Sequence, residues 1–121
     1  MKFHLQSPGV GLVTGLGDGW IKVGMTEYRA NVVLTPESAE PGFAPGGFDA
    51  LDAPDFAQLL RYQPEVVLFG TGKQQRFPHP RLMEPLTSAH VGVEIMDTRA
   101  ACRTFNILVG EGRRVVAALI V

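Results

Sequence analysis

The stretch EVVLFGTGKQQRFP, residues 65–78, passes abruptly from an apolar run to a glycine-containing loop that carries a lysine and an arginine. Residues 66–69 show no polar alternation, which is typical of a strand covered on both faces of a sheet. The loop after this strand has two possible roles. Its backbone amides could hold an anionic ligand, or its glycines could let the chain turn sharply beneath a neighbouring strand.

Helical patterns separate this strand from two further predicted strands, at residues 92–96 and 114–120. A first helix is predicted to start at Asp52, whose carboxylate can cap it, and to end at Pro64. A second helix is predicted within residues 80–90, where an internal proline kinks it or marks a later start. Strands that alternate with helices along the chain favour parallel pairing, because parallel neighbours need a crossover connection.

The third helix is predicted to begin at Asp97 or Thr98 and to end near Gly110 or Gly112. Together these elements predict an α/β fold, a three-layer sandwich around a central mixed, largely parallel sheet. In this sheet residues 66–69 and 93–96 are expected to be adjacent and to run in the same direction. The side on which these strands end is where open α/β sheets commonly form a crevice.

The first half of the chain has a different pattern, rich in glycine and proline. Asp18 and Gly19 precede an alternating stretch at residues 20–23, which predicts an N-terminal β-hairpin. Another strand is predicted at residues 30–35. Residues 36–51 contain three prolines and three glycines, which favours a long irregular loop. We expect both halves to form parts of one sheet in a single domain, residues 1–121.

Composition restricts the classes of function. A net charge of -1 with 19% charged residues gives no indication of nucleic-acid binding or of a polybasic membrane patch. The longest apolar run, VVAALIV at residues 115–121, is too short to cross a membrane. The only cysteine, Cys102, excludes an intrachain disulfide and fits a reducing compartment. Since residues 1–11 lack the apolar stretch of a secretory signal, we expect a cytoplasmic protein without membrane insertion.

Neither common nucleotide motif fits the loop after residues 66–69. A phosphate-binding P-loop would need glycine at Val67 and a hydroxyl residue at Gln74, and a dinucleotide fingerprint would need glycine at Gln75. An anion could still bind the loop amides with help from Lys73 and Arg76. The steric role of the glycines is favoured over this binding role.

Other reactive side chains have simple structural explanations. Cys102 lies too far into its helix for strong activation and is expected to be a small packing residue. Asp97 and Thr98 are explained as helix caps. The histidines lie in separate segments without a helical pair at metal-ligand spacing, namely His4, His79 and His90. No catalytic residue and no metal site is assigned.

Residues 69–78 and 92–120 resemble a family of domains of unknown function that includes the mitochondrial complex I assembly factor 3 and the adipogenesis-associated Mth-domain-containing protein. The residues that match the family pattern are Gly70, Thr71, Gly72, Glu94, Asp97, Thr98, Ala101, Cys102, Thr104, Phe105, Asn106, Glu111, Gly112 and Arg113. The resemblance implies a single Mth-type α/β domain, no established enzymatic activity, no cofactor and an assembly role exerted through proteins. Because this chain shows no transit peptide, a bacterial setting is expected.

Two functions therefore remain open. The first is a non-catalytic, assembly-factor-like protein whose partners include assembly clients of a membrane complex. It predicts an exposed apolar patch around the glycine loop and the loop from Pro36. The alternative is a small-molecule or anion-binding protein, or else an enzyme, with its site in a crevice where Asp97 works as base or Thr98 as hydrogen-bond donor. The candidate binding residues are Gly70, Thr71, Gly72, Lys73, Asp97 and Thr98.

Overall fold

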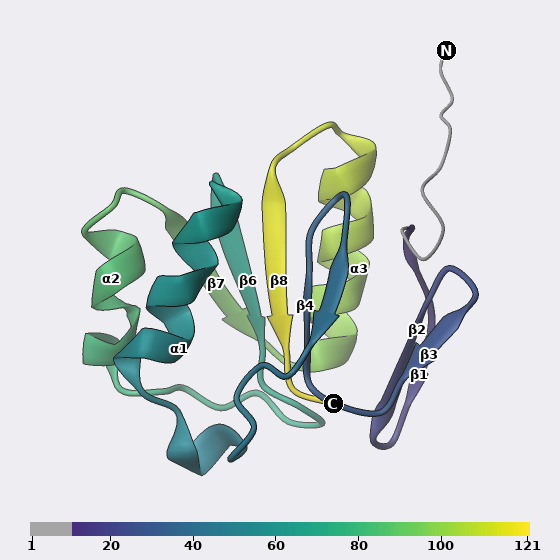
Figure 1. Cartoon of the computed structure of the whole chain (residues 1–121), viewed down its shortest axis with the longest axis horizontal. Coiled ribbons are helices and arrows are strands. Elements are labelled where there is room, and N and C mark those ends of the chain that lie inside the picture. Colours follow the sequence, from purple (N-terminus) through teal and green to yellow (C-terminus); the bar gives the residue numbers. More distant parts are fainter. Residues whose placement is uncertain (1–10) are drawn as a thin grey trace.

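The computed structural model describes residues 11–121, and its largest element is a five-stranded mixed sheet (Figure 1). The expectations placed on His4 and on residues 1–10 lie outside the described residues. The order across the sheet is β5-β4-β8-β6-β7. The strands are β4 (Val32–Leu34), β5 (Ala39–Pro41), β6 (Val66–Gly70), β7 (Gly92–Met96) and β8 (Val115–Leu119).

Strand β6 lies between β8 and β7 and runs parallel to both. All five of its residues are buried, which confirms the strand predicted from its unbroken apolar run. Phe69 pairs with Ile95, so the predicted adjacency and common direction of β6 and β7 are also confirmed. The predominance of parallel pairing is not confirmed, because β4 is antiparallel to both β8 and β5.

One face of the sheet is covered by short helical elements. These are α1 (Ala53–Ala57), a 3₁₀ helix (Gln58–Tyr62), a second 3₁₀ helix (Pro80–Met83) and α2 (Glu84–Thr87). The side chain of Asp52 accepts a hydrogen bond from the amide of Ala53, and the side chain of Asp55 accepts one from the amide of Asp52. This reciprocal arrangement confirms the predicted cap. Pro85 occupies the first turn of α2, where its missing N–H has no helical partner to lose.

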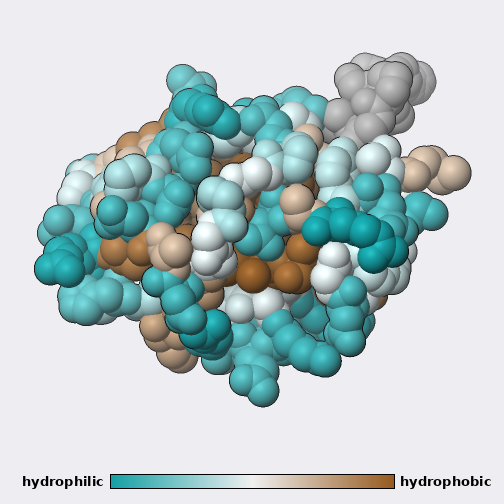
Figure 2. All heavy atoms as spheres, turned by 60° about the horizontal axis from the view of Figure 1, so that its bottom comes forward, coloured by the Kyte–Doolittle hydropathy of each residue, from teal (hydrophilic) through white to brown (hydrophobic). Residues whose placement is uncertain are grey.

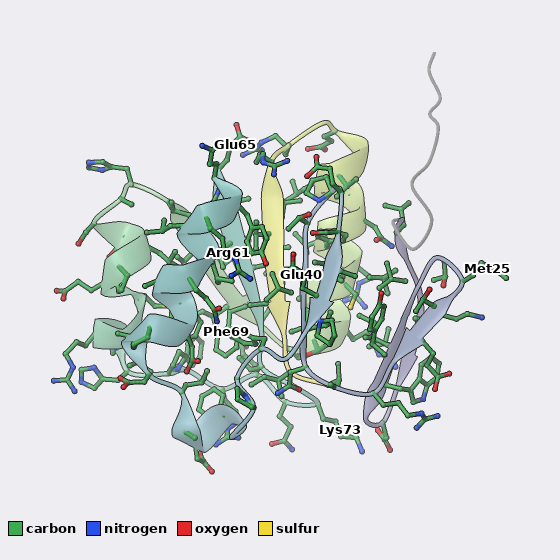
Figure 3. The ribbon with its side chains drawn as sticks, in the orientation of Figure 1. Met25, Glu40, Arg61, Glu65, Phe69 and Lys73 are labelled. Atoms are coloured by element: carbon green, nitrogen blue, oxygen red, sulfur yellow. The ribbon has the colours of Figure 1, made fainter. Side chains whose placement is uncertain are left out.

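Phe69 of β6 organises the core on this face (Figure 3). Its ring centroid lies 5.1 Å from that of Phe56 and 6.2 Å from that of Phe43, both in edge-to-face geometry. Phe48 stacks on Phe69, with the guanidinium of Arg76 3.9 Å from the Phe48 centroid. Such aromatic contacts add stability beyond the area that they bury.

Residues 36–51 are only in part the irregular loop that was predicted. They contain β5 and a 3₁₀ helix at Phe48–Ala50. Phe43 and Ala44 are buried, at 2% and 3% exposure, and they join the core below Phe69. Phe43 of this segment is buried and Phe48 half-buried, so within the two loops of the predicted apolar patch only Phe77, at 72% exposure, is a large exposed hydrophobic side chain.

The opposite face is covered by α3 (Thr98–Gly110) and by a separate antiparallel sheet. The small sheet comprises β1 (Val13–Gly17), β2 (Trp20–Val23) and β3 (Thr26–Tyr28). The hairpin predicted at Asp18 and Gly19 is confirmed, and Gly19 has a φ of 77°. The expectation that both halves of the chain share one sheet is confirmed only in part: β4 and β5 join the large sheet, whereas β1–β3 pair only with one another.

Asn106 and apolar side chains hold the small sheet against α3. The side-chain amide of Asn106 donates to the carbonyl of Val13 at 3.0 Å and accepts from its amide at 2.9 Å. Ile21 and Val23 pack into the same core as Phe105 of α3. One outer layer thus combines a helix with a sheet, so the simple three-layer sandwich is not confirmed. Among residues 11–121, none of the helices has the length and apolar character that a membrane crossing requires.

Replacing Gly70 by alanine is expected to destabilise this fold by about 1 to 3 kcal/mol, because the added Cβ overpacks a filled site. It would lie 2.8 Å from Cδ2 of Leu119 and 3.1 Å from the Cα of Thr98. Urea unfolding of Gly70→Ala measures the loss. Gly110→Ala is the control, since nothing lies within 4 Å of its added Cβ. Equal stability of Gly70→Ala and the wild type would contradict this account.

Candidate functional site

A cleft lies at the end of the large sheet toward which β6, β7 and β8 point. Its volume is about 430 Å³, and it is bounded by the β1–β2 turn, the loop after β6 and the start of α3. Gly72, Lys73, Asp97 and Thr98 all line it. Figure 2 brings this end of the molecule forward and shows hydrophobic residues in the middle of the face, with hydrophilic residues around them. Four of the six predicted site residues therefore meet in one place.

Thr98 connects three segments below the cleft. Its side chain is buried, and its hydroxyl donates to the carbonyl of Ile120 at 2.6 Å. The same oxygen accepts from the amide of Gly72 at 2.8 Å, and the Thr98 amide donates to the Gly72 carbonyl at 2.9 Å. The loop after β6, the end of β8 and the start of α3 are thus joined through one residue.

Thr71 lies deeper and is fully engaged as well. Its amide donates to the carbonyl of Met96 at 2.9 Å. Its hydroxyl donates to the carbonyl of Gln74 at 2.7 Å and accepts from the amide of Arg76 at 3.1 Å. A backbone amide that already donates within the fold has no hydrogen left for a ligand.

The anion-binding alternative is therefore not supported by this geometry. The amides of Thr71 and Gly72, which were expected to hold the ligand, both point to acceptors of the protein itself. Gly70 is buried, and its missing side chain makes room for Thr98 and Leu119. The steric role of the glycines is the one that these contacts favour.

Within residues 11–121, three of the four charged groups of the cleft have internal partners, and Arg99 is the exception. The carboxylate of Asp97 accepts from the amide of Ala100 at 2.8 Å and caps α3, as predicted. Lys73 lies 3.3 Å from Asp18 across the cleft, and both side chains are more than 80% exposed. Such an exposed ion pair contributes little to stability.

Cys102 does not contribute a nucleophile. The side chain is 2% exposed, and burial raises the pKa of the thiol to about 12, although Arg99 and Arg103 act in the opposite direction. At neutral pH the thiol is protonated and therefore weakly nucleophilic. The predicted role of Cys102 as a packing residue is confirmed by its place in the core.

The described histidines do not share a site. His79 accepts from the amide of Arg81 at 3.1 Å and caps a 3₁₀ helix, and His90 is exposed with a φ of 62°. Across residues 11–121, no three His, Cys, Asp or Glu side chains gather where they could share a metal ion.

Eight of the twelve residues that line the cleft were not among the predicted site residues, and Trp20 and Arg99 are the most prominent of them. The Trp20 ring lies over Gly15 and Gly17 of the neighbouring strand; a Cβ at Gly17 would lie 2.7 Å from Cε2 of Trp20, whereas one at Gly15 would be in ordinary contact at 3.6 Å. The feature of the sequence that could have indicated the position of Trp20 is the pair of glycines at alternate positions of the opposite hairpin strand. No sequence motif marks Arg99, because Arg99 reaches the cleft only through the packing of α3 beside the hairpin.

Replacing Thr98 by valine is expected to destabilise the protein by about 1 to 3 kcal/mol, because Gly72 and Ile120 would each lose a hydrogen-bond partner in a part-buried place. Urea unfolding of Thr98→Val gives the change. Thr87→Val serves as control, since Thr87 is exposed and its hydroxyl donates at a long 3.4 Å. Equal losses in the two variants would refute the bridging role.

The raised pKa of Cys102 predicts a fall in stability at alkaline pH. The unfolded thiol loses its proton from about pH 9, whereas the folded thiol keeps it to about pH 12. Between these values the folded state binds more protons, so the free energy of unfolding falls by up to about 1.4 kcal/mol per pH unit. Urea unfolding over this pH range should give a shallower decline for Cys102→Ala. Parallel declines would show that the thiol does not contribute.

Part of the chain is similar to the NADH dehydrogenase (ubiquinone) 1 alpha subcomplex assembly factor 3 of Danio rerio. The two are 33% identical over 97 residues, which is 80% of this chain and 56% of that protein. The protein of the same name from Mus musculus is 40% identical over 62 residues. The chain spans 34% to 56% of the length of these relatives.

A protein of Bordetella parapertussis, known from its crystal structure, has a similar fold and a similar sequence. The TM-score is 0.85 with 38% identity, and the match covers 95% of this chain and 98% of that one. A Bordetella pertussis protein described as a Mth938-like domain matches with a TM-score of 0.70 and 32% identity. The model of a family described as protein of unknown function (DUF498/DUF598) matches residues 13–120, so the chain belongs to this family.

Proposed function

We propose that this chain is a non-catalytic protein-binding domain that assists the assembly of a membrane-bound complex in a bacterial cytoplasm. The observation that carries the proposal is the similarity, over 80% of the chain, to a protein named as an assembly factor. The single domain and the cytoplasmic location remain predictions from the sequence. Fold similarity alone would not support the function, because one fold hosts many functions.

The geometry of the cleft supports binding over catalysis. The amides of Thr71 and Gly72, the hydroxyl of Thr98 and the Oδ1 atom of Asp97 are engaged in hydrogen bonds within the fold. The preorganised free donors that would stabilise developing charge in a transition state are therefore not supplied by these amides. The cleft offers apolar surface with exposed charged side chains at its edge. A surface of this kind suits contact with another protein.

Crosslinking in native membranes and cytoplasm tests the proposal. A tagged chain is expressed in a bacterium that encodes it, treated with a lysine-reactive crosslinker and purified under denaturing conditions. We expect mass spectrometry to identify subunits of a membrane complex enriched over a tag-only control, and a tagged subunit should recover this chain in turn. Recovery of no protein above the control, or normal assembly of that complex in a strain lacking the chain, would refute the function.

A further inference from the structure

Two arginines beside the cleft, Arg99 and Arg103, form no ion pair among residues 11–121, and the same is true of Lys22 and Arg81 elsewhere on the surface. Both Arg99 and Arg103 are exposed. Six other cations each pair with a carboxylate, namely Arg29, Arg61, Lys73, Arg76, Arg113 and Arg114. Arg99 lines the cleft, and Arg103 lies one turn further along α3.

The stability of α3 does not explain these arginines. Arg99 occupies the first turn after the Asp97 cap, where the helix dipole disfavours positive charge. A positively charged side chain that destabilises the start of its own helix is a local conflict of the kind found at functional positions. Ile107, 60% exposed, follows Arg103 by four residues and therefore lies on the same side of the helix.

The surface formed by the cleft edge and α3 carries a positive excess. Asp18 and Asp97 offset Lys73 and Arg99 at the cleft, and Arg103 adds a further positive charge on α3, whose residues Thr98–Gly110 include no carboxylate. Inside, Leu16, Trp20 and Ile120 supply apolar surface. A complementary partner therefore carries negative charge next to an apolar group.

We propose that the cleft, together with Arg99, Arg103 and Ile107 of α3, binds an acidic amphipathic segment of a partner protein. An apolar side chain of the segment enters the cleft against Trp20 and Ile120. Two carboxylates spaced by about 6 Å, as on successive turns of a helix, pair with the two arginines. This inference rests on the proposed function and names the chemistry of the partner.

Trp20 allows a direct test, because it is the only tryptophan of the chain and lies in the cleft. Random tryptophan-free peptides, about a dozen residues long, are displayed and selected on the intact protein. We expect the selected peptides to combine spaced Asp or Glu with an apolar residue, and to shift the emission of Trp20 when added as synthetic peptides. Selection of peptides without acidic residues, or of none at all, would overturn the proposal.

Charge reversal locates the binding site. Arg99→Glu and Arg103→Glu are each expected to weaken the selected peptides about five- to tenfold, whereas Arg81→Glu should leave the affinity unchanged. Arg81 is the matched control because it is exposed, forms no ion pair within the described residues and lies on the opposite face of the sheet. Urea unfolding verifies that the variants fold, and Arg99→Glu should even favour the start of α3. Equal affinities in all variants would overturn the proposal.

Two further measurements separate other outcomes. Phosphatidylglycerol vesicles should not shift the emission of Trp20. If the vesicles do shift it, and Arg99→Glu abolishes that shift, the arginines bind a membrane surface and the proposal is overturned. The membrane crosslinking experiment is repeated with Arg99→Glu and Arg103→Glu. If these variants capture the partner as well as the wild type does, this inference is overturned and the proposed function remains intact. If the wild type captures no partner, the proposed function itself fails.

Discussion

The close approach of β6 to the start of α3 at Gly70 is the constraint on which the rest of this structure depends. Without a side chain at Gly70, the Cα of Thr98 and the side chain of Leu119 occupy the space that a Cβ would take. The hydroxyl of Thr98 then lies within reach of both the loop after β6 and the end of β8. Two parallel strands and the helix that follows β7 are thereby fixed at one point, and the floor of the cleft is formed by this junction.

This junction also determines what the cleft can do. In a phosphate-binding loop the glycine amides point outward and remain free for the ligand. Here the amides of Thr71 and Gly72 point into the protein, so a similar run of residues produces a rigid support instead of a binding loop. Recognition is then left to the side chains around the cleft, from the hairpin on one side and α3 on the other. This division suits contact with a protein surface better than capture of a small anion.

The features that the sequence predicts well are those that depend on neighbouring residues. The cap of α3 at Asp97 and the buried strand β6 follow from local pattern, and the meeting of Lys73 with Asp97 follows from the rule that parallel strands end at one edge. Pairing over long range is different. The antiparallel contact of β4 with β8 and the contact of Asn106 with Val13, 93 residues away, are set by packing that no local pattern encodes. Trp20 and Arg99 were missed for the same reason.

The attachment of the small sheet has a consequence for how the family can vary. Across residues 11–121, no backbone hydrogen bond joins β1–β3 to the five-stranded sheet, and the union is made by side chains such as Asn106. The position of one wall of the cleft relative to the other is therefore set by side-chain packing and by the short connection from β3 to β4. Substitutions among these packing residues would change the width of the opening without altering the pairing of any strand. Related chains with one shared architecture can in this way differ in the shape of the cleft.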